Sequence, residues 1–232
     1  MTPIAIIALV FFVSAVLLLL ILQHKAKAPT TRPVLISFYG DSITRGDGLD
    51  PRPVERRTEL AKGAFIGLDY SVGGATVQDA TAGYWKLPYK ACFSEWIKED
   101  QSALIVIGHA GANALGYPDK IDEYDDLLTA MIHQAQATGK TVVLSGMSWV
   151  AAPVQGLPEA DSVRILQALA DFDDRTEAIA IRESCRFLDL RSVPFNGAVD
   201  MLDSVHPGQA YADRISAYVT TQLIEILGAS HD

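Results

Sequence analysis

The sequence has no excess of positive charge and lacks the common nucleotide- and metal-binding motifs. It holds 19 Lys and Arg residues against 28 Asp and Glu residues, which gives a formal net charge of −9. Phosphate binding needs clustered Lys and Arg, so this composition argues against a nucleic-acid partner. The chain also contains no G-x-G-x-x-G, no P-loop lysine motif and no H-E-x-x-H.

Cysteine is scarce as well. Cys92 and Cys185 lie far apart and belong to no C-x-x-C pair. Two cysteines allow either one disulfide or two separate thiols, and the count leaves both alternatives open. The cysteine content therefore does not fix the cellular compartment.

One long uncharged run stands at the start of the chain. Pro3 to Leu22 is twenty residues without a charge, and a transmembrane helix needs about 20 apolar residues. A cleaved signal peptide has a shorter apolar core, of about 7–15 residues, after a basic start, and nothing basic precedes this run. We therefore expect an uncleaved membrane anchor over residues 1–24 and a linker over residues 25–33.

The remaining residues, 34–232, are expected to form one domain. Strands alternating with helices predict a parallel sheet covered on both faces, which is a three-layer α/β/α fold. In such sheets ligands bind at the carboxyl ends of the strands. Apolar runs predict strands at 34–39, 103–108, 141–146 and 186–190 and a weaker one at 65–72, and helical spacing predicts helices at 120–138, 161–184 and 208–228.

The segment SFYGDSITRG places Ser42 directly behind Gly-Asp at the end of the first predicted strand. A helix cap is the simplest role for this serine, whereas a nucleophile needs a base and an acid that orients the base. Among the five histidines, His206 stands in DSVHPG, three residues after Asp203. That spacing lets one loop present the carboxylate to one ring nitrogen while the other nitrogen faces the serine. His109, at the end of a predicted strand, stays a second candidate.

Two loops that follow predicted strands offer donors for an oxyanion. The segment SVGGAT, at 71–76, has a Gly-Gly backbone that can come close to a substrate. The segment GHAGANALG, at 108–116, carries the side-chain amide of Asn113. By contrast, Ser148 lies in half of a G-x-S-x-G elbow without the second glycine, and is a poor nucleophile candidate.

In this order, Gly-Asp-Ser, the Gly-Gly loop, G-x-N and D-x-x-H-P resemble the SGNH, or GDSL-type, esterase and lipase family over nearly the whole predicted domain. The resemblance implies a flavodoxin-like fold. It also implies that Ser42 is the nucleophile, His206 the base and Asp203 the acid. The backbone N–H groups of Ser42 and Gly74 and the amide of Asn113 would form the oxyanion hole.

The sequence departs from the family pattern at two positions. Ala114 stands where the third block usually has an aspartate, and Asp69 stands where the second block usually has an asparagine. Neither change removes an implied catalytic group. Asp41 lacks a second metal ligand at useful spacing, and we expect it to stabilise the turn that holds Ser42.

The expected reaction is hydrolysis of a carboxylic O-acyl ester, such as an O-acetyl ester, through an acyl-enzyme, with no metal or organic cofactor. The expected partners are a small-molecule, saccharide or lipid ester and, through the anchor, a membrane. A lysophospholipid or thioester substrate, acyl transfer, and a catalytically silent binding module stay open as alternatives. The positive-inside rule favours a cytoplasmic domain, whereas a tethered bacterial hydrolase is more often outside, so sidedness also stays open, as does the oligomeric state.

Overall fold

Five parallel strands form the centre of the domain in the order β2-β1-β3-β4-β5. The computed structural model describes residues 32–82, 92–108, 113, 121–154 and 157–229. The strand order is that of flavodoxin-like folds, with the switch in strand order at β1 and β3. The predicted flavodoxin-like fold and all five predicted strands are confirmed: β1 Val34–Gly40, β2 Phe65–Asp69, β3 Leu104–Gly108, β4 Thr141–Ser145 and β5 Arg186–Leu188.

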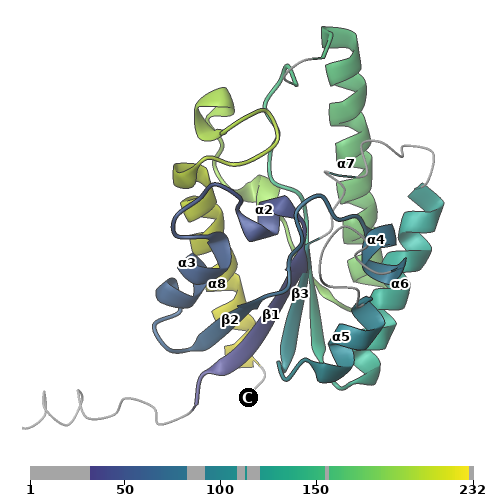
Figure 1. Ribbon diagram of the computed structural model, residues 1–232, viewed down its shortest axis with the longest axis vertical. Helices are drawn as coiled ribbons and strands as arrows, with labels where there is room; N and C mark the ends of the chain where they lie inside the picture. Colours follow the sequence, from purple (N-terminus) through teal and green to yellow (C-terminus); the bar gives the residue numbers. More distant parts are fainter. Residues whose placement is uncertain (1–31, 83–91, 109–112, 114–120, 155–156, 230–232) are drawn as a thin grey trace, which may run out of the picture. The chain divides into compact units, whose positions relative to one another are not determined.

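Helices cover both faces of this sheet (Figure 1). On one face α3 and α8 pack against β-branched and aromatic side chains such as Ile36, Phe38 and Val106. On the other face α4, α5, α6 and α7 bury a larger apolar cluster around Tyr39 and Ile107. The helix bounds are α2 Ser42–Arg45, α3 Pro53–Leu60, α4 Val77–Ala82, α5 Phe93–Glu99, α6 Ile121–Ala137, α7 Glu159–Arg182 and α8 Gln209–Ala229, with short 3-10 turns at Leu190–Ser192 and Gly197–Asp200.

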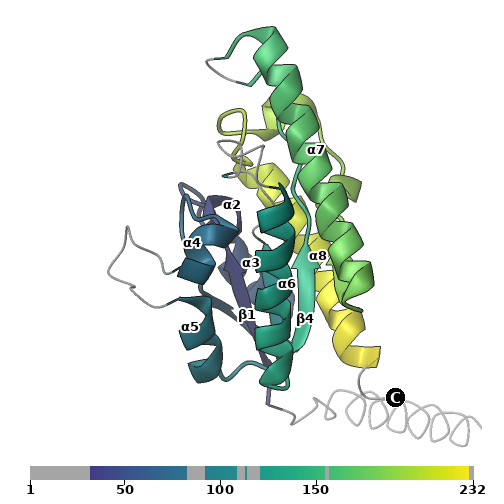
Figure 2. The same ribbon diagram turned by 90° about the vertical axis from the view of Figure 1, so that its right-hand side faces the viewer.

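The three predicted helices correspond to α6, α7 and α8, whereas the shorter α3, α4 and α5 were not predicted. Helix α3 shows why, because its sequence PVERRTEL has few apolar residues and its buried face includes Arg57. A buried arginine interrupts the apolar periodicity on which the prediction depends. Helix α7 is long enough for its amino-terminal part to rise beyond the carboxyl edge of the sheet (Figure 2).

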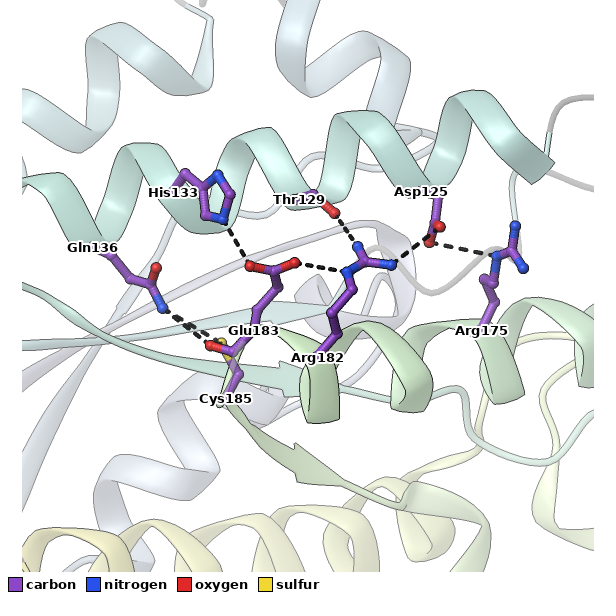
Figure 3. Close-up of polar contacts among 8 residues, drawn as sticks. All are labelled: Asp125, Thr129, His133, Gln136, Arg175, Arg182, Glu183 and Cys185. Carbon is purple, nitrogen blue, oxygen red and sulfur yellow. Dashed lines mark hydrogen bonds and ion pairs between the residues drawn. The ribbon is translucent and has the colours of Figure 1, made fainter.

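A polar network on the outer surface ties α6 to the end of α7 (Figure 3). His133 Nε2 lies 2.7 Å from Glu183 Oε2, and Arg182 donates from Nε to the other oxygen of Glu183 at 2.7 Å. The same guanidinium reaches Thr129 at 2.6 Å and Asp125 at 3.4 Å. The network therefore links two helices that are distant in sequence.

The structure also bears on the predicted membrane anchor and on the two cysteines. The predicted anchor, residues 1–24, lies outside the described residues, and none of the described helices is both long and apolar enough to span a bilayer. Cys92 and Cys185 are both free thiols. Burial raises the pKa of the Cys185 thiol to about 11, so that this sulfur is protonated at neutral pH.

Candidate active site

Ser42 is the first residue of α2 and follows the carboxyl end of strand β1 (Figure 1). The helix cap is Asp41, whose Oδ1 accepts the backbone N–H of Ile43 at 2.9 Å. Gly46 ends the helix in the left-handed conformation, with φ +70°, which glycine adopts without a steric penalty. The expectation that Asp41 stabilises this turn is confirmed, and the Ser42 side chain is left free for another role.

Two glycines seat α2 on the edge of the sheet. Gly40 and Gly108 are register partners on β1 and β3. A Cβ at either position would lie within 3.0 Å of the Thr44 hydroxyl oxygen, at 2.1 Å for Gly40 and 2.9 Å for Gly108. Only glycine allows this close approach of the helix to the sheet. The sequence signal for it, a glycine at the end of each of two adjacent strands, was available but was not recognised.

A hydrogen-bonded chain joins Ser42, His206 and Asp203. Ser42 Oγ lies 2.9 Å from His206 Nε2, and His206 Nδ1 lies 2.8 Å from Asp203 Oδ2. An ionised carboxylate only accepts hydrogen bonds, so in the neutral imidazole Nδ1 carries the proton and Nε2 accepts from the serine hydroxyl. The structure thus brings together three residues that the sequence places up to 164 positions apart.

The second oxygen of Asp203 is also occupied. Asp203 Oδ1 accepts the backbone N–H groups of Val205 and His206, both at 2.7 Å. Partial burial opposes the negative charge, but these backbone bonds and the imidazole N–H outweigh it and hold the pKa of Asp203 below its usual range. Asp203 is therefore ionised at neutral pH and acts as an acceptor only.

Backbone hydrogen bonds join the two ends of the loop that carries Asp203 and His206. Leu202 N donates to the carbonyl of His206 at 2.9 Å, and Gly208 N donates to the carbonyl of Asp200 at 2.7 Å. The buried carboxylate of Asp200 accepts from Arg214 of α8 at 2.5 Å. These supporting residues were not predicted, because their pairing depends on how the loop folds back onto α8.

Asp41 carries a second electrostatic feature of the site. The residue is 3% exposed, and burial raises its pKa to about 6, although backbone hydrogen bonds and the charge of His206 oppose that shift. A titratable carboxyl group therefore lies next to the serine, inside the turn that positions it.

The Gly-Gly loop lies on the other side of Ser42. Val72 N donates to the carbonyl of Gly40 at 2.8 Å, which continues the β1 pairing beyond the end of β2. A Cβ at Gly73 would lie 4.0 Å from Ser42 Cβ, so this loop runs beside the serine. Gly74 follows with φ +77°, a conformation that favours glycine.

Asn113 is held against the same loop. Its Nδ2 donates to the carbonyl of Ala75 at 2.9 Å. An amide nitrogen carries two protons, so one stays available after this bond is made. Asp69 supports the loop in turn, because its Oδ1 accepts both the N–H (2.9 Å) and the hydroxyl of Ser71. An aspartate at that position therefore still provides the acceptor that orders the loop.

Three further residues were singled out in the sequence, namely His109, Ala114 and Ser148. His109 and Ala114 lie outside the described residues. Ser148 is buried and its hydroxyl has no hydrogen-bond partner among the described residues. In that same part of the chain, no group of three or more His, Cys, Asp or Glu side chains is arranged to hold a metal ion.

An apolar cluster borders the serine and histidine. It consists of buried residues from the β4–α7 loop and from α7, and the residues next to the proposed catalytic pair pack against it, namely Ile43 and Val205. Trp149 lies in the same loop, is 43% exposed and stacks on Phe195 with ring centroids 6.2 Å apart. The amino-terminal part of α7 and this loop thus form an apolar wall beside the site.

Comparisons with known proteins agree with this geometry. The model of the GDSL-like Lipase/Acylhydrolase family matches residues 38–214. The acetylxylan esterase Axe2 from Geobacillus stearothermophilus is 17% identical with a TM-score of 0.62, over 83% of this chain and 95% of that chain. A GDSL-like lipase from Bacteroides thetaiotaomicron is 21% identical with a TM-score of 0.59, over 86% and 94%.

A third solved structure, TesA, is 22% identical with a TM-score of 0.60, over 82% of this chain and 99% of that chain. At these identities the structural likeness establishes the fold. A comparison with curated proteins finds no match.

Proposed function

Because this chain belongs to the GDSL-like lipase/acylhydrolase family, and is therefore an ester-cleaving hydrolase, we propose that it hydrolyses carboxylic O-acyl esters through an acyl-enzyme formed on Ser42. The observation that carries the proposal is the continuous chain from Ser42 Oγ to His206 Nε2 at 2.9 Å and from His206 Nδ1 to Asp203 at 2.8 Å. A nucleophile, a base and an orienting acid are the three parts that serine hydrolysis requires.

In the first half-reaction the Ser42 oxygen attacks the ester carbonyl carbon while His206 Nε2 takes the hydroxyl proton. The tetrahedral intermediate collapses when the imidazolium returns that proton to the leaving alcohol oxygen, which leaves an acyl-Ser42 ester. In the second half-reaction His206 takes a proton from a water molecule whose oxygen adds to the acyl carbon. The new tetrahedral intermediate then loses its bond to Ser42 Oγ, the imidazolium returns the proton to that oxygen, and the carboxylic acid departs. Asp203 keeps the imidazole in the reactive tautomer and stabilises its charge throughout.

The negative charge that develops on the carbonyl oxygen needs donors that are already in position. We assign this role to the backbone N–H groups of Ser42 and Gly74 and to the second amide proton of Asn113. The bond from Asn113 to Ala75 supports the assignment, because it fixes the amide against the loop that contains Gly74.

An O-acyl ester of a saccharide is the favoured substrate class. The acetylxylan esterase with a similar fold acts, by its name, on acetylated xylan, which supports an O-acyl ester carried by a saccharide. A lysophospholipid, a thioester or an acyl acceptor other than water would use the same catalytic groups.

Steady-state hydrolysis of an ester panel by the full chain tests this function. Wild type is expected to cleave 4-methylumbelliferyl acetate and butyrate, and Ser42→Ala is expected to lose at least about 10³-fold in kcat. Ser216→Ala, a buried serine of α8, is the control for this mutation, because its hydroxyl has no hydrogen-bond partner among the described residues and it does not line the cavity that contains Ser42. Equal rates for wild type and Ser42→Ala would refute the proposal.

We also propose that residues 1–24 anchor the enzyme in a membrane, on the basis of the uncharged run from Pro3 to Leu22. Full-length protein is then expected to stay in the membrane fraction after alkaline carbonate extraction. A reporter fused to the C-terminus would assign the side of the membrane. Release of the full-length chain by carbonate would contradict an anchor.

A further inference from the structure

A cavity behind the serine extends into the domain. Its lining includes both Ser42 and His206 at one end. Its deeper wall is made of core residues of β3, the turn after β5, and α8, namely Val106, Leu190 and Ile215, which are at most 5% exposed. The cavity therefore joins the reacting groups to the upper end of the apolar core between the sheet, α3 and α8.

One side chain in this lining does not suit an apolar core. Arg57 of α3 is 5% exposed, and its Nε has no hydrogen-bond partner among the described residues. Its guanidinium lies 4.9 Å from the centre of the Phe38 ring. Burial lowers the pKa of Arg57 to about 10, which still leaves the side chain charged at neutral pH.

A buried cation without a bonded anion is costly, because the guanidinium loses its hydration and gains little in return. The charge of Asp69 acts on Arg57, but the Asp69 carboxylate is exposed and accepts hydrogen bonds from Ser71. A second buried donor without a partner, the hydroxyl of Ser148, lines the same cavity. Two donors in one cavity that have no partner in the described part of the chain indicate a ligand that accepts hydrogen bonds.

The other charged groups of the lining are already engaged. Asp47 forms an ion pair with Arg45 at 2.9 Å. Asp41 caps α2 through Ile43. His206 belongs to the catalytic chain, so Arg57 is the permanent cation of the cavity that is available to an anionic ligand.

We propose that this cavity binds the acyl part of the substrate, and that the acyl group ends in a carboxylate that pairs with Arg57. The preferred substrate is then a half ester of a dicarboxylic acid, and hydrolysis releases the free dicarboxylic acid and the alcohol. The proposal deepens the function proposed above and rests on it, since the acyl group is defined by attachment to Ser42.

The shape of the site favours the acyl part over the alcohol. A cavity bounded on its inner side by core residues accepts an acyl chain of limited length, whereas a saccharide alcohol continues outward as a ring or a chain. Besides Ser42 and Arg57 the lining contains apolar side chains such as Leu49 and Pro53, which suit the methylene groups of a short dicarboxylic acid. A guanidinium matches a terminal carboxylate in a two-bond geometry.

The test compares two ester series with the same alcohol, 4-methylumbelliferone. One series carries succinyl, glutaryl and adipyl half esters, and the other carries butyryl, pentanoyl and hexanoyl esters, with non-enzymatic hydrolysis subtracted. The measured quantity is the ratio of kcat/KM for each half ester to that of the neutral ester of equal length. For wild type this ratio is expected to be about 10 to 100 for the half ester of the best length. That is the gain in kcat/KM that a hydrogen bond to a charged group provides.

Because the net charge of −9 repels anions in general, a ratio above one needs a specific cation. Arg57→Met keeps an unbranched side chain and removes the charge, and it is expected to lower the ratio about tenfold or more. Arg57→Lys is expected to retain part of the ratio. Arg56→Met on the same helix is the matched control, because Arg56 pairs with Glu59 at 3.1 Å and is not part of the lining.

Thermal unfolding separates binding from a structural role. Removal of an unpartnered buried charge is expected to leave Tm of Arg57→Met equal to or above that of wild type. A ratio at or below one for wild type would overturn the proposal, as would a fall in Tm of Arg57→Met with no change in the ratio. Preference for a carboxylate on the alcohol side, tested with 4-acetoxybenzoate against 4-acetoxytoluene, would also overturn it. If Ser42→Ala hydrolysed the neutral esters as fast as wild type, the proposed function would be overturned instead.

Discussion

Two histidine–carboxylate pairs of nearly equal length lie in this molecule, and their surroundings differ. In the loop before α8, His206 Nδ1 lies 2.8 Å from Asp203. On the outer surface of α6 and α7, His133 Nε2 lies 2.7 Å from Glu183 (Figure 3). The distances alone do not tell the two pairs apart.

The groups around each histidine–carboxylate pair distinguish the two pairs. The free ring nitrogen of His206 meets the Ser42 hydroxyl at 2.9 Å, whereas His133 has a 60% exposed side chain and, among the described residues, no serine or cysteine hydrogen-bonded to its ring. The second oxygen of Asp203 accepts two backbone N–H groups, while that of Glu183 accepts Arg182. A histidine–carboxylate pair therefore gains a chemical role from the third group it meets and from the rigidity of its loop.

Removal of the two histidines gives the largest expected contrast. His206→Ala is expected to lower kcat for ester hydrolysis by about 10⁴-fold, because the base that activates Ser42 is lost. His133→Ala is expected to keep kcat within about twofold, since its ring lies on the outer surface of α6. Steady-state kinetics on 4-methylumbelliferyl butyrate measures both, and similar losses in the two variants would contradict the distinction.

Neutralising the carboxylates of Asp203 and Glu183 is expected to give the second-largest difference in kcat. Asp203→Asn keeps the shape of the loop but can no longer fix the imidazole tautomer, so kcat is expected to fall about 10²- to 10⁴-fold at nearly constant KM. Glu183→Gln serves as the matched control and is expected to retain full activity. An unchanged kcat in Asp203→Asn would remove Asp203 from the catalytic chain.

The proposed oxyanion donors, which lie near Ser42, are the second feature that distinguishes the two pairs within the described residues. Asn113→Ala is expected to lower kcat about 10²- to 10³-fold with little change in KM, because the amide acts mainly on charge that develops in the transition state. Asn113→Asp, which keeps the size but offers no N–H donor when ionised, is expected to be at least as impaired. A change confined to KM would assign Asn113 to substrate binding instead.

The pH dependence of stability should differ in sign between the two regions. Burial raises the pKa of Asp41 from 3.8 to about 6, so the folded protein holds this proton more tightly than the unfolded chain. Stability from this group is then present below about pH 4 and is lost as the pH rises to about 6, by up to about 3 kcal/mol. Hydrogen bonds from Arg182 and His133 lower the pKa of Glu183, so its contribution is present above pH 4.5 and is lost as the pH falls.

Urea unfolding between pH 4 and pH 7 checks this opposition of sign. Asp41→Asn keeps the capping oxygen and should remove the loss of stability between pH 4 and pH 6, while Glu183→Gln should leave that loss in place. Parallel curves for wild type and Asp41→Asn would show that the Asp41 carboxyl group is not perturbed.

The smallest expected effect belongs to the arginine of the outer network. Arg182 is half exposed, and surface ion pairs add little to stability. Arg182→Ala is expected to lower Tm by less than about 3 °C without affecting ester hydrolysis. Differential scanning calorimetry would measure the shift, and a large loss of activity would show that α6 and α7 are coupled to the site.

The sequence allowed the sheet and the long helices to be predicted because their apolar residues recur with clear periods. The strand order was implied only by the family resemblance, and the contact of α2 with Gly40 and Gly108 was not predicted, because contact between strands does not appear in any single segment. Helix α3 was missed because Arg57 occupies a buried position where the pattern calls for an apolar residue.

The candidate site shows a similar division. Ser42, Asp203 and His206 could be picked out by residue type and spacing, since each stands in a polar turn that follows or precedes a regular element. The bond from Asn113 to Ala75 and the supporting pair of Asp200 and Arg214 depend on how distant loops fold together. The cavity that contains Arg57 forms only when α3 and α8 pack on the sheet. No local sequence pattern therefore predicts it.

The most direct test of the central claim is the intact mass of the full chain after reaction with a fluorophosphonate probe. Our account predicts one adduct in wild type, mapped to Ser42 by peptide mass spectrometry, and none in Ser42→Ala, while His133→Ala labels like wild type. Ester hydrolysis by a wild-type protein that forms no adduct at Ser42 would contradict it.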